Sequence, residues 1–174
     1  MIILGFTGFL RTSEILNLQV RDILFQSDYM QLNIRCSKTD QLQHGATVNI
    51  AKIESPLCPF TFTKQFIDDT GLRNDDFLIC KLRSTKRGHN VQGHLPLSYS
   101  RARNTFLSHM KRVFPDKNIG LHGLRAGGAT MSAKHKVDNR LISKHGRWMT
   151  EHTRDDYIRP DIQDSLSVTQ NLGL

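Results

Sequence analysis

Large aromatic residues are scarce in this chain of 174 residues, which has one tryptophan and three tyrosines. Two of these four rings, Trp148 and Tyr157, lie nine positions apart in the polar stretch HGRWMTEHTRDDYIRP at 145–160. Because the neighbouring residues are mostly charged, we do not expect the two rings to serve as simple core filling. Their position raises the question of what a charged segment uses them for.

Long apolar runs and paired cysteines are also absent. No stretch of 18 apolar residues occurs, so a membrane span is not expected. The first residues, MIILGFTGFLRTSE, lack a basic region and a cleavage site, which argues against a signal peptide. Cys36, Cys58 and Cys80 form no CxxC pair, which favours reduced thiols over a disulfide scaffold or a zinc finger. A hydrophobic fraction of 38% is enough for one domain with its own core.

Acidic residues are outnumbered, with 16 Asp and Glu against 24 Lys and Arg, which gives a formal net charge of +8. Such a surplus favours a polyanionic partner, with nucleic acid first. A basic surface kept for solubility is the alternative that composition alone leaves open.

Hydrophobic periodicity predicts a mainly helical α+β domain with one small antiparallel sheet near the N-terminus. Residues 4–23 read as a helix that restarts after Thr7 and Gly8. Residues 29–37 and 46–53 alternate as strands, with a hairpin loop between them. We expect helices over 56–71, 98–114, 122–135, 138–146, 150–159 and the tail after Pro160, an extended piece over 75–80 and a basic loop over 81–94.

Two basic side chains near the N-terminus are candidates for chemistry. Arg11 falls on the same helical spacing as the apolar positions around it, where an unpaired charge is costly. It therefore needs a carboxylate partner, such as Glu14 or Asp22, or it faces a ligand. Lys38 lies in the predicted hairpin loop, where most lysines are simply solvated.

A second pair of candidates lies near the middle of the chain. His122 and Arg125 are spaced i, i+3, which places both on one face of a helix. Guanidinium groups match phosphate oxygens two at a time, so two arginines, a lysine and a histidine at one point would form a phosphate site. A tyrosine beside a phosphate can act as a nucleophile. Each of these residues is weak evidence alone.

The order of these residues resembles the catalytic domain of tyrosine recombinases, the phage-integrase family. The similarity covers nearly the whole chain. Within it, the sequence segments LRAGGAT and HGRW are most similar to those of recombinases from eukaryotic mobile elements. The motifs that carry it are TGFLRTSEILNLQVRDI with Arg11, SKTDQ with Lys38, LHGLRAGGAT with His122 and Arg125, and HGRWMTEHTRDDYI with Trp148 and Tyr157.

The resemblance implies the cleavage and rejoining of DNA strands through a phosphotyrosine at Tyr157. Arg11 and Arg125 would clamp the scissile phosphate, and Lys38 would protonate the leaving 5′-oxygen. His122 would assist removal of the tyrosine proton. Trp148 takes a position where the family commonly has histidine; an indole donates one hydrogen bond but cannot move protons. No metal ion or other cofactor is expected.

The resemblance also sets expectations for partners and extent. The partner would be double-stranded DNA, with a homo-oligomer on it and no membrane. Residues 1–174 would form a recombinase catalytic domain that is incomplete at its N-terminus, with the DNA-clamp domain absent. Location would be nuclear in a eukaryote, cytoplasmic or nucleoid-associated in a bacterium, and not secreted. An inactive DNA-binding remnant and an enzyme similar to type IB topoisomerases are the alternatives.

Overall fold

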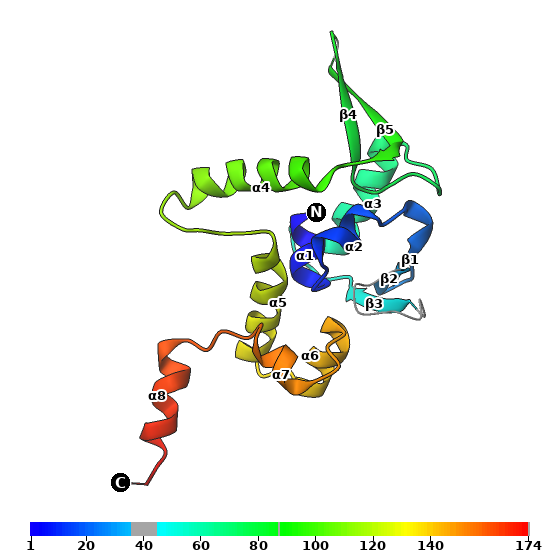
Figure 1. Cartoon of the computed structure of the whole chain (residues 1–174). Coiled ribbons are helices and arrows are strands. Elements are labelled where there is room, and N and C mark those ends of the chain that lie inside the picture. Colours follow the sequence, from blue (N-terminus) through cyan, green and yellow to red (C-terminus); the bar gives the residue numbers. More distant parts are fainter. Residues whose placement is uncertain (36–44, 87, 174) are drawn as a thin grey trace.

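The computed structural model describes residues 1–35, 45–86 and 88–173, and its arrangement is shown in Figure 1. Lys38 lies outside these residues. In the part described, no helix is long and apolar enough to cross a membrane. The elements agree with the predicted class: helices dominate, and the strands pair only with antiparallel neighbours.

A three-stranded sheet follows the first helices, as the alternating pattern predicts. Its strand order is β1–β2–β3, with β2 paired to β3 from Tyr29 opposite Ala51 to Ile34 opposite Ala46. The predicted inward residues Met30, Leu32 and Ile34 are all buried. The strand β1 was not predicted, because three residues are too few to show an alternation. The strands are β1 Ile23–Phe25, β2 Tyr29–Ile34 and β3 Ala46–Ala51.

The first helical segment is interrupted as expected, but Arg11 is not inside a helix. Helix α1 spans Ile2–Thr7, and α2 spans Thr12–Leu16 with the 3₁₀ turn η1 Val20–Asp22 after it. Arg11 is the residue that caps the N-terminus of α2 and has an extended backbone. The break between the two helices contains Phe9, whose φ of 47° bends the chain.

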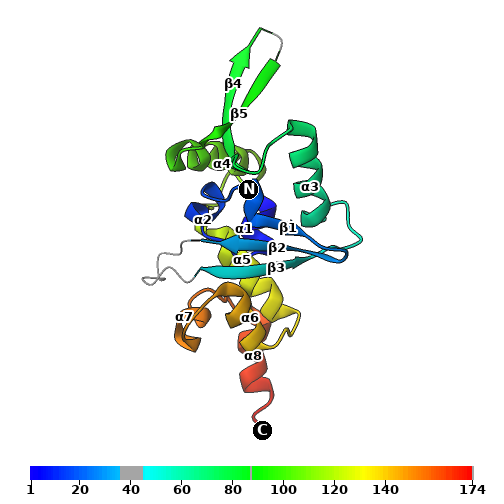
Figure 2. The same cartoon turned by 90° about the vertical axis from the view of Figure 1, so that its right-hand side faces the viewer.

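The basic segment 81–94 is a β-hairpin, and the prediction of a loop there was wrong. Strand β4 spans Cys80–Thr85 and pairs with β5, which spans Gly88–Pro96. The two strands project from the body of the domain as an arm, which Figures 1 and 2 show from two sides. Both faces of the arm are largely polar, so the alternation that marks a half-buried strand is missing from its sequence.

The remaining helices lie close to where the periodicity places them. Ser98, Asp138 and Thr150 accept backbone N–H bonds at the starts of α4, α6 and α7. Helix α7 is shorter than predicted, and Tyr157 follows its end. The helices are α3 Pro59–Thr70, α4 Tyr99–Val113, α5 His122–Lys134, α6 Asn139–Gly146, α7 Glu151–Asp155 and α8 Ile162–Gln170.

Two clusters of buried side chains hold these elements together. The larger cluster joins α1, α2, α3 and the three-stranded sheet, and the smaller one comprises Phe9, Ala129, Ile142 and Trp148. Helices α1 and α5 approach closely at Gly128, where any Cβ atom would collide with the Phe6 carbonyl oxygen and the Phe9 ring. The helix break at Phe9 is thereby fixed against α5, and the candidate site forms beside it.

Candidate active site

A buried carboxylate joins two arginines at the start of α2. One oxygen of Glu14 lies 3.1 Å from Arg11 Nη1, and the other lies 2.6 Å from Arg147 Nη2. The side chain of Glu14 is only 1% exposed, and it also accepts the backbone N–H of Arg11 at 2.8 Å. A carboxylate in this position holds two guanidinium groups side by side, and one negative charge leaves the group with a net positive charge.

Arg125 is the largest fully buried side chain of the described residues, at 1% exposure. Its two Nη groups donate to the backbone carbonyl oxygens of Phe9 and Gly146. A bulky residue with positive φ is unfavourable, and the bend at Phe9 is what turns this carbonyl toward Arg125. The guanidinium therefore ties the break between α1 and α2 to the end of α6.

Two rings lie against the Arg125 guanidinium, and a third ring, His122, contacts one of them. The Arg125 Cζ atom lies 4.7 Å from the centre of the Trp148 ring and 5.2 Å from that of Tyr157. Trp148 and Tyr157 lie 4.9 Å apart, and the His122 ring lies 5.0 Å from Tyr157. Cation–π attraction and ring contact together hold the tyrosine, which is half-buried, beside the cationic cluster.

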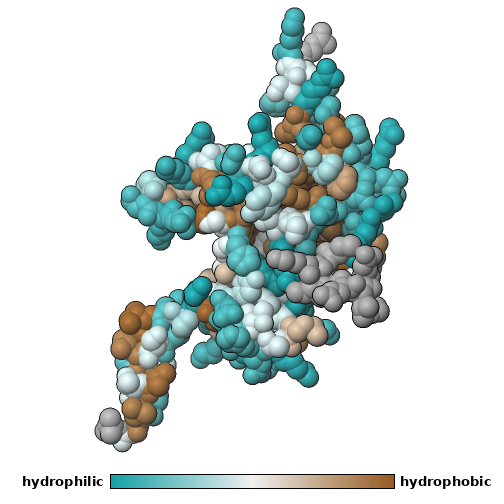
Figure 3. Space-filling view, in the orientation of Figure 1, coloured by the Kyte–Doolittle hydropathy of each residue, from teal (hydrophilic) through white to brown (hydrophobic). Residues whose placement is uncertain are grey.

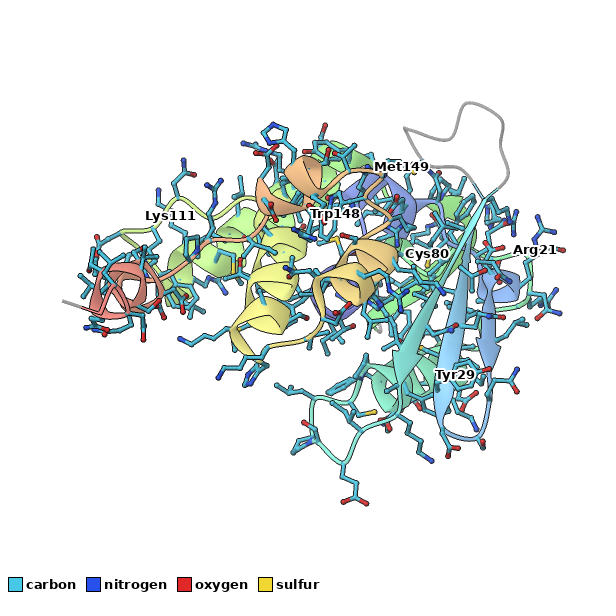
Figure 4. The ribbon with its side chains drawn as sticks, turned by 90° about the horizontal axis from the view of Figure 1, so that it is seen from below. Arg21, Tyr29, Cys80, Lys111, Trp148 and Met149 are labelled. Atoms are coloured by element: carbon cyan, nitrogen blue, oxygen red, sulfur yellow. The ribbon has the colours of Figure 1, made fainter. Side chains whose placement is uncertain are left out.

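Thr130 of α5 fixes the backbone at Tyr157. Its hydroxyl donates to the Tyr157 carbonyl oxygen at 3.2 Å and accepts the Arg159 backbone N–H at 3.0 Å. Helix α7 ends at Asp155, and the Tyr157 N–H continues its last turn with a bond of 2.9 Å to the Arg154 carbonyl oxygen, so the bonds from Thr130 add a tertiary attachment to α5. Figure 4 shows Trp148 within the packed layer of α5, α6 and α7.

The clustered charges shift the titration of the site. The pKa of Arg125 is lowered to about 10, mainly by burial, with the charges of Arg147 and Arg11 adding to the effect and that of Glu14 opposing it. Partial desolvation lowers the pKa of His122, and Arg125 and Arg11 add to the effect. Lowering the pKa of His122 keeps the ring neutral at neutral pH, which is the form that accepts a proton.

Three buried N–H groups of the site have no acceptor among the described residues. They are Arg125 Nε, Arg147 Nε and Trp148 Nε1. A buried donor without a partner costs about 1–3 kcal/mol, and three in one cationic cluster form an environment that favours an anion. Within the described residues, no group of His, Cys, Asp and Glu has the geometry of a metal site.

Comparison with known proteins identifies the relatives of this arrangement. No protein-family model matches the chain. The chain is 28% identical over 170 residues to an integrase/recombinase XerD homologue of Selenomonas ruminantium, covering 91% of this chain and 46% of that protein.

Solved structures share the fold. The XerH site-specific recombinase in a post-cleavage complex with difH DNA superposes with a TM-score of 0.74 at 17% identity, over 99% of this chain and 44% of that one. XerA recombinase gives 0.68 at 20% identity, over 98% and 54%, and the Tn1549 transposon integrase gives 0.61 at 15%, over 99% and 57%. The chain thus spans about half the length of the relatives it matches.

The chain is thus similar in sequence to an integrase/recombinase and shares the fold of solved tyrosine recombinases. Its sequence relative is bacterial, and the narrower similarity to recombinases of eukaryotic mobile elements stays a prediction.

The structure brings together five of the six residues that the recombinase motifs predict: Arg11, His122, Arg125, Trp148 and Tyr157. Lys38, the sixth, lies outside the described residues. The alternative considered for Arg11 is also realised, since Glu14 is its carboxylate partner. Asp22, the other candidate partner, pairs instead with Arg35 at 2.6 Å.

Sequence reasoning missed Arg147 as part of this site. It directly precedes Trp148, has a left-handed backbone (φ 57°) at the end of α6, and is drawn into the cluster by Glu14. The available signal was a third arginine inside the motif HGRW. Its partner lies 133 positions away, so spacing alone could not connect the two.

Proposed function

We propose that this chain carries the DNA cleavage and rejoining activity of a site-specific tyrosine recombinase. The observation that carries the proposal is the anion-favouring cluster of three unpartnered N–H donors, two of which belong to Arg125 and Trp148 directly beside the Tyr157 ring. A scissile phosphate placed there would meet positive charge on the same side as a phenol. The relatives named above are recombinases and integrases, and XerH was solved on its DNA in a post-cleavage state.

In the proposed reaction, the Tyr157 hydroxyl oxygen attacks the phosphorus of a backbone phosphate. The P–O bond to the 5′-oxygen breaks as the phosphotyrosine bond forms, and the freed 5′-oxygen leaves as a hydroxyl. Rejoining reverses these steps with a 5′-hydroxyl from another strand. One phosphoester replaces another, so the sequence of steps consumes no energy-rich cofactor.

The proton transfers and the charge that develops in this reaction assign roles to the remaining residues. Neutral His122 takes the proton of Tyr157, because a tyrosine hydroxyl is mostly protonated at neutral pH. Lys38 supplies the proton to the leaving 5′-oxygen. Arg11 and Arg125 stabilise the negative charge that builds up on the non-bridging oxygens, and the indole N–H of Trp148 donates to one of them.

Trapping of the covalent intermediate tests the proposal. The substrates are nicked duplexes, from which the short fragment that carries the freed 5′-hydroxyl diffuses away after cleavage. Rejoining is then prevented, and we expect the protein to stay covalently attached to the DNA. A library with a randomised core removes the need to know the target sequence, and sequencing the trapped DNA then reveals it. Tyr157→Phe should form no adduct, whereas the matched variant Tyr99→Phe, at the exposed start of α4, should form it normally.

Mass spectrometry of the adduct identifies the linked residue. Attachment at Tyr29 or Tyr99 would show that the assignment of the nucleophile is wrong. DNA binding without any adduct would support the inactive remnant. Cleavage of one duplex without sequence preference, followed by its relaxation, would support the topoisomerase alternative.

A further inference from the structure

The excess positive charge of this chain is concentrated in one continuous segment. Of its 24 Lys and Arg residues, eight lie within 77–115, a segment that contains none of the 16 Asp and Glu residues. The rest of the chain therefore holds 16 residues of each sign and is formally neutral. Residues 77–115 fold into the β4–β5 arm and α4, which adjoin each other in Figures 1 and 2.

The arm presents a basic face. Lys81 lies opposite Gln92 and Arg83 lies opposite Asn90, and residues paired in this way share one face of a hairpin. Lys81 and Arg83 are exposed, as is Lys86 at the turn. One face therefore combines two cations with two side-chain amides, all of which can donate hydrogen bonds to phosphate oxygens.

Helix α4 continues the basic surface. Ala102 and Phe106 are its buried residues, and the helical period places Arg101, Lys111 and Arg112 toward the opposite side, where all three are exposed. In Figure 4, Lys111 lies away from Trp148, so the C-terminal end of α4 is separate from the catalytic cluster. Figure 3 shows hydrophilic residues over both the arm and the free end of α4.

The described cations of this segment take part in no ion pair. Within the described residues, the ion pairs involve Arg11, Arg21, Arg35, Lys134, Arg147 and Arg154, and none of them lies in 77–115. Unneutralised cations on an extended surface attract polyanions and release counterions when they bind one.

We propose that the β4–β5 arm and the solvent face of α4 form a second DNA-contacting surface that holds the phosphate backbone of the duplex outside the cleavage site. The surface supplies affinity and leaves the chemical step to the cluster around Tyr157. Helix α4 packs against α2, whose first residue is capped by Arg11, so this surface is fixed relative to the site. The inference takes duplex DNA as partner from the proposed function.

Three charge-matched variants test this surface, each removing three positive charges. The arm variant is Lys81→Gln, Arg83→Gln, Lys86→Gln, and the helix variant is Arg101→Gln, Lys111→Gln, Arg112→Gln. The control, Lys64→Gln, Arg73→Gln, Arg140→Gln, removes exposed cations that have no ion pair among the described residues. Melting temperatures are compared first to establish that all three are folded.

The readout is the dissociation constant for a duplex measured over a range of NaCl concentrations. Each lost phosphate contact lowers the slope of log K against log salt by about 0.9. We therefore expect the arm and helix variants each to lose about 2–3 units of slope and on the order of tenfold in affinity near physiological salt, by the same counterion argument. The control variant should lose less than one unit of slope. Covalent trapping at saturating DNA should proceed at the unmodified rate in all three.

The outcomes separate this inference from the proposed function. Slopes equal to that of the control, in a protein that still forms the covalent adduct, would overturn the second surface and leave the recombinase proposal intact. Reduced slopes in a protein that forms no adduct would support the surface and reject the activity. Unchanged DNA affinity with loss of assembly would assign the segment to protein contacts, which would also overturn the inference.

Discussion

Arg125 has a structural role in this fold, and the proposed reaction gives the same guanidinium group a chemical role. Two of its nitrogens bind the carbonyl oxygens of Phe9 and Gly146, which fixes the geometry of the site, and its third faces no acceptor among the described residues. The same side chain lies against both the Trp148 and the Tyr157 rings. A group placed in this way contributes its charge without having to move, which is the condition under which electrostatic stabilisation is strongest.

Replacing Arg125 by lysine is expected to slow cleavage by about 10²–10³-fold, the usual cost of losing one charge-stabilising donor. A lysine ammonium cannot serve two carbonyl groups and a phosphate in the planar geometry of a guanidinium. The melting temperature should fall as well, because hydrogen bonds to a charged group contribute about 1.5–3 kcal/mol.

Single-turnover cleavage of the trapped substrate measures the rate, below the melting temperature of the variant. Arg140→Lys, on the exposed side of α6, is the matched control and should change neither quantity. A folded Arg125→Lys protein that cleaves at a near-normal rate would remove Arg125 from the chemistry.

At the scale of the elements, the site depends on how α6 is attached to α1. His145 Nε2 lies 2.8 Å from the Thr7 carbonyl oxygen, and because that oxygen can only accept, Nε2 carries the proton. The ring also contacts Phe9 edge-on at 4.7 Å. His145 therefore connects the end of α6, which leads into Trp148, to the helix break that contains Phe9.

The stability of this attachment should depend on pH. Burial lowers the pKa of His145, with Arg147 and Arg125 adding to the effect and the bond to Thr7 opposing it. Below the ordinary histidine pKa of about 6.5, the unfolded chain binds more protons at this position than the folded one. The contribution of neutral His145 to the free energy of unfolding is thus fully present above that pH, and it is lost as the pH falls through the lowered pKa.

Urea unfolding at pH 7.5, 6.5 and 5.5 measures this effect. In His145→Gln, whose amide can still donate to Thr7 but cannot titrate, the loss of stability toward pH 5.5 should be smaller than in the unmodified protein. His135→Gln, on the exposed turn after α5, should leave the loss unchanged. An equal loss in both variants would show that His145 does not couple folding to pH.

The elements that sequence predicted correctly share strong local signals. The strands β2 and β3 alternate, and the helices begin at Ser98, Asp138 and Thr150 because these side chains cap them. The β4–β5 arm escaped prediction because neither of its faces is apolar throughout. The joint order of the motif residues predicted a group of side chains that the structure brings together, apart from Lys38, which lies outside the described residues. The contact between Glu14 and Arg147 depends on tertiary folding and could not be predicted from the spacing of residues in the sequence.

At the scale of the whole molecule, α8 stands apart from the rest of the chain. None of its residues is buried, and Figures 1 and 2 show it projecting from the domain. Ile162, Leu166 and Val168 are exposed along it, and Figure 3 shows its hydrophobic surface. An ion pair between Lys134 and Asp161, 3.1 Å long and exposed, connects its first turn to α5. In this structure α8 is therefore not folded over the core of its own domain.

Deletion of residues 161–174 should therefore leave the melting temperature nearly unchanged, since an exposed ion pair contributes about 0–1 kcal/mol. We expect assembly on DNA to be lost, because an uncovered apolar helix at the surface is suited to docking on a neighbouring protomer. Calorimetry and light scattering of the DNA complex measure the two quantities.

A conservative version of the same test replaces Leu166 and Val168 by serine and keeps the chain length. Assembly should fall in this variant as well. A large drop in the melting temperature together with intact assembly would mean that the tail stabilises its own domain in solution.

The position of Trp148 has an optical consequence. It is the only indole in the chain, and it lies against both the Arg125 guanidinium and the Tyr157 ring. All tryptophan emission from this protein therefore originates at one point, within contact of the proposed nucleophile. Fluorescence excited near the red edge of the indole band would follow the arrival of DNA and the covalent attachment of Tyr157 in real time, with no dye attached to the protein.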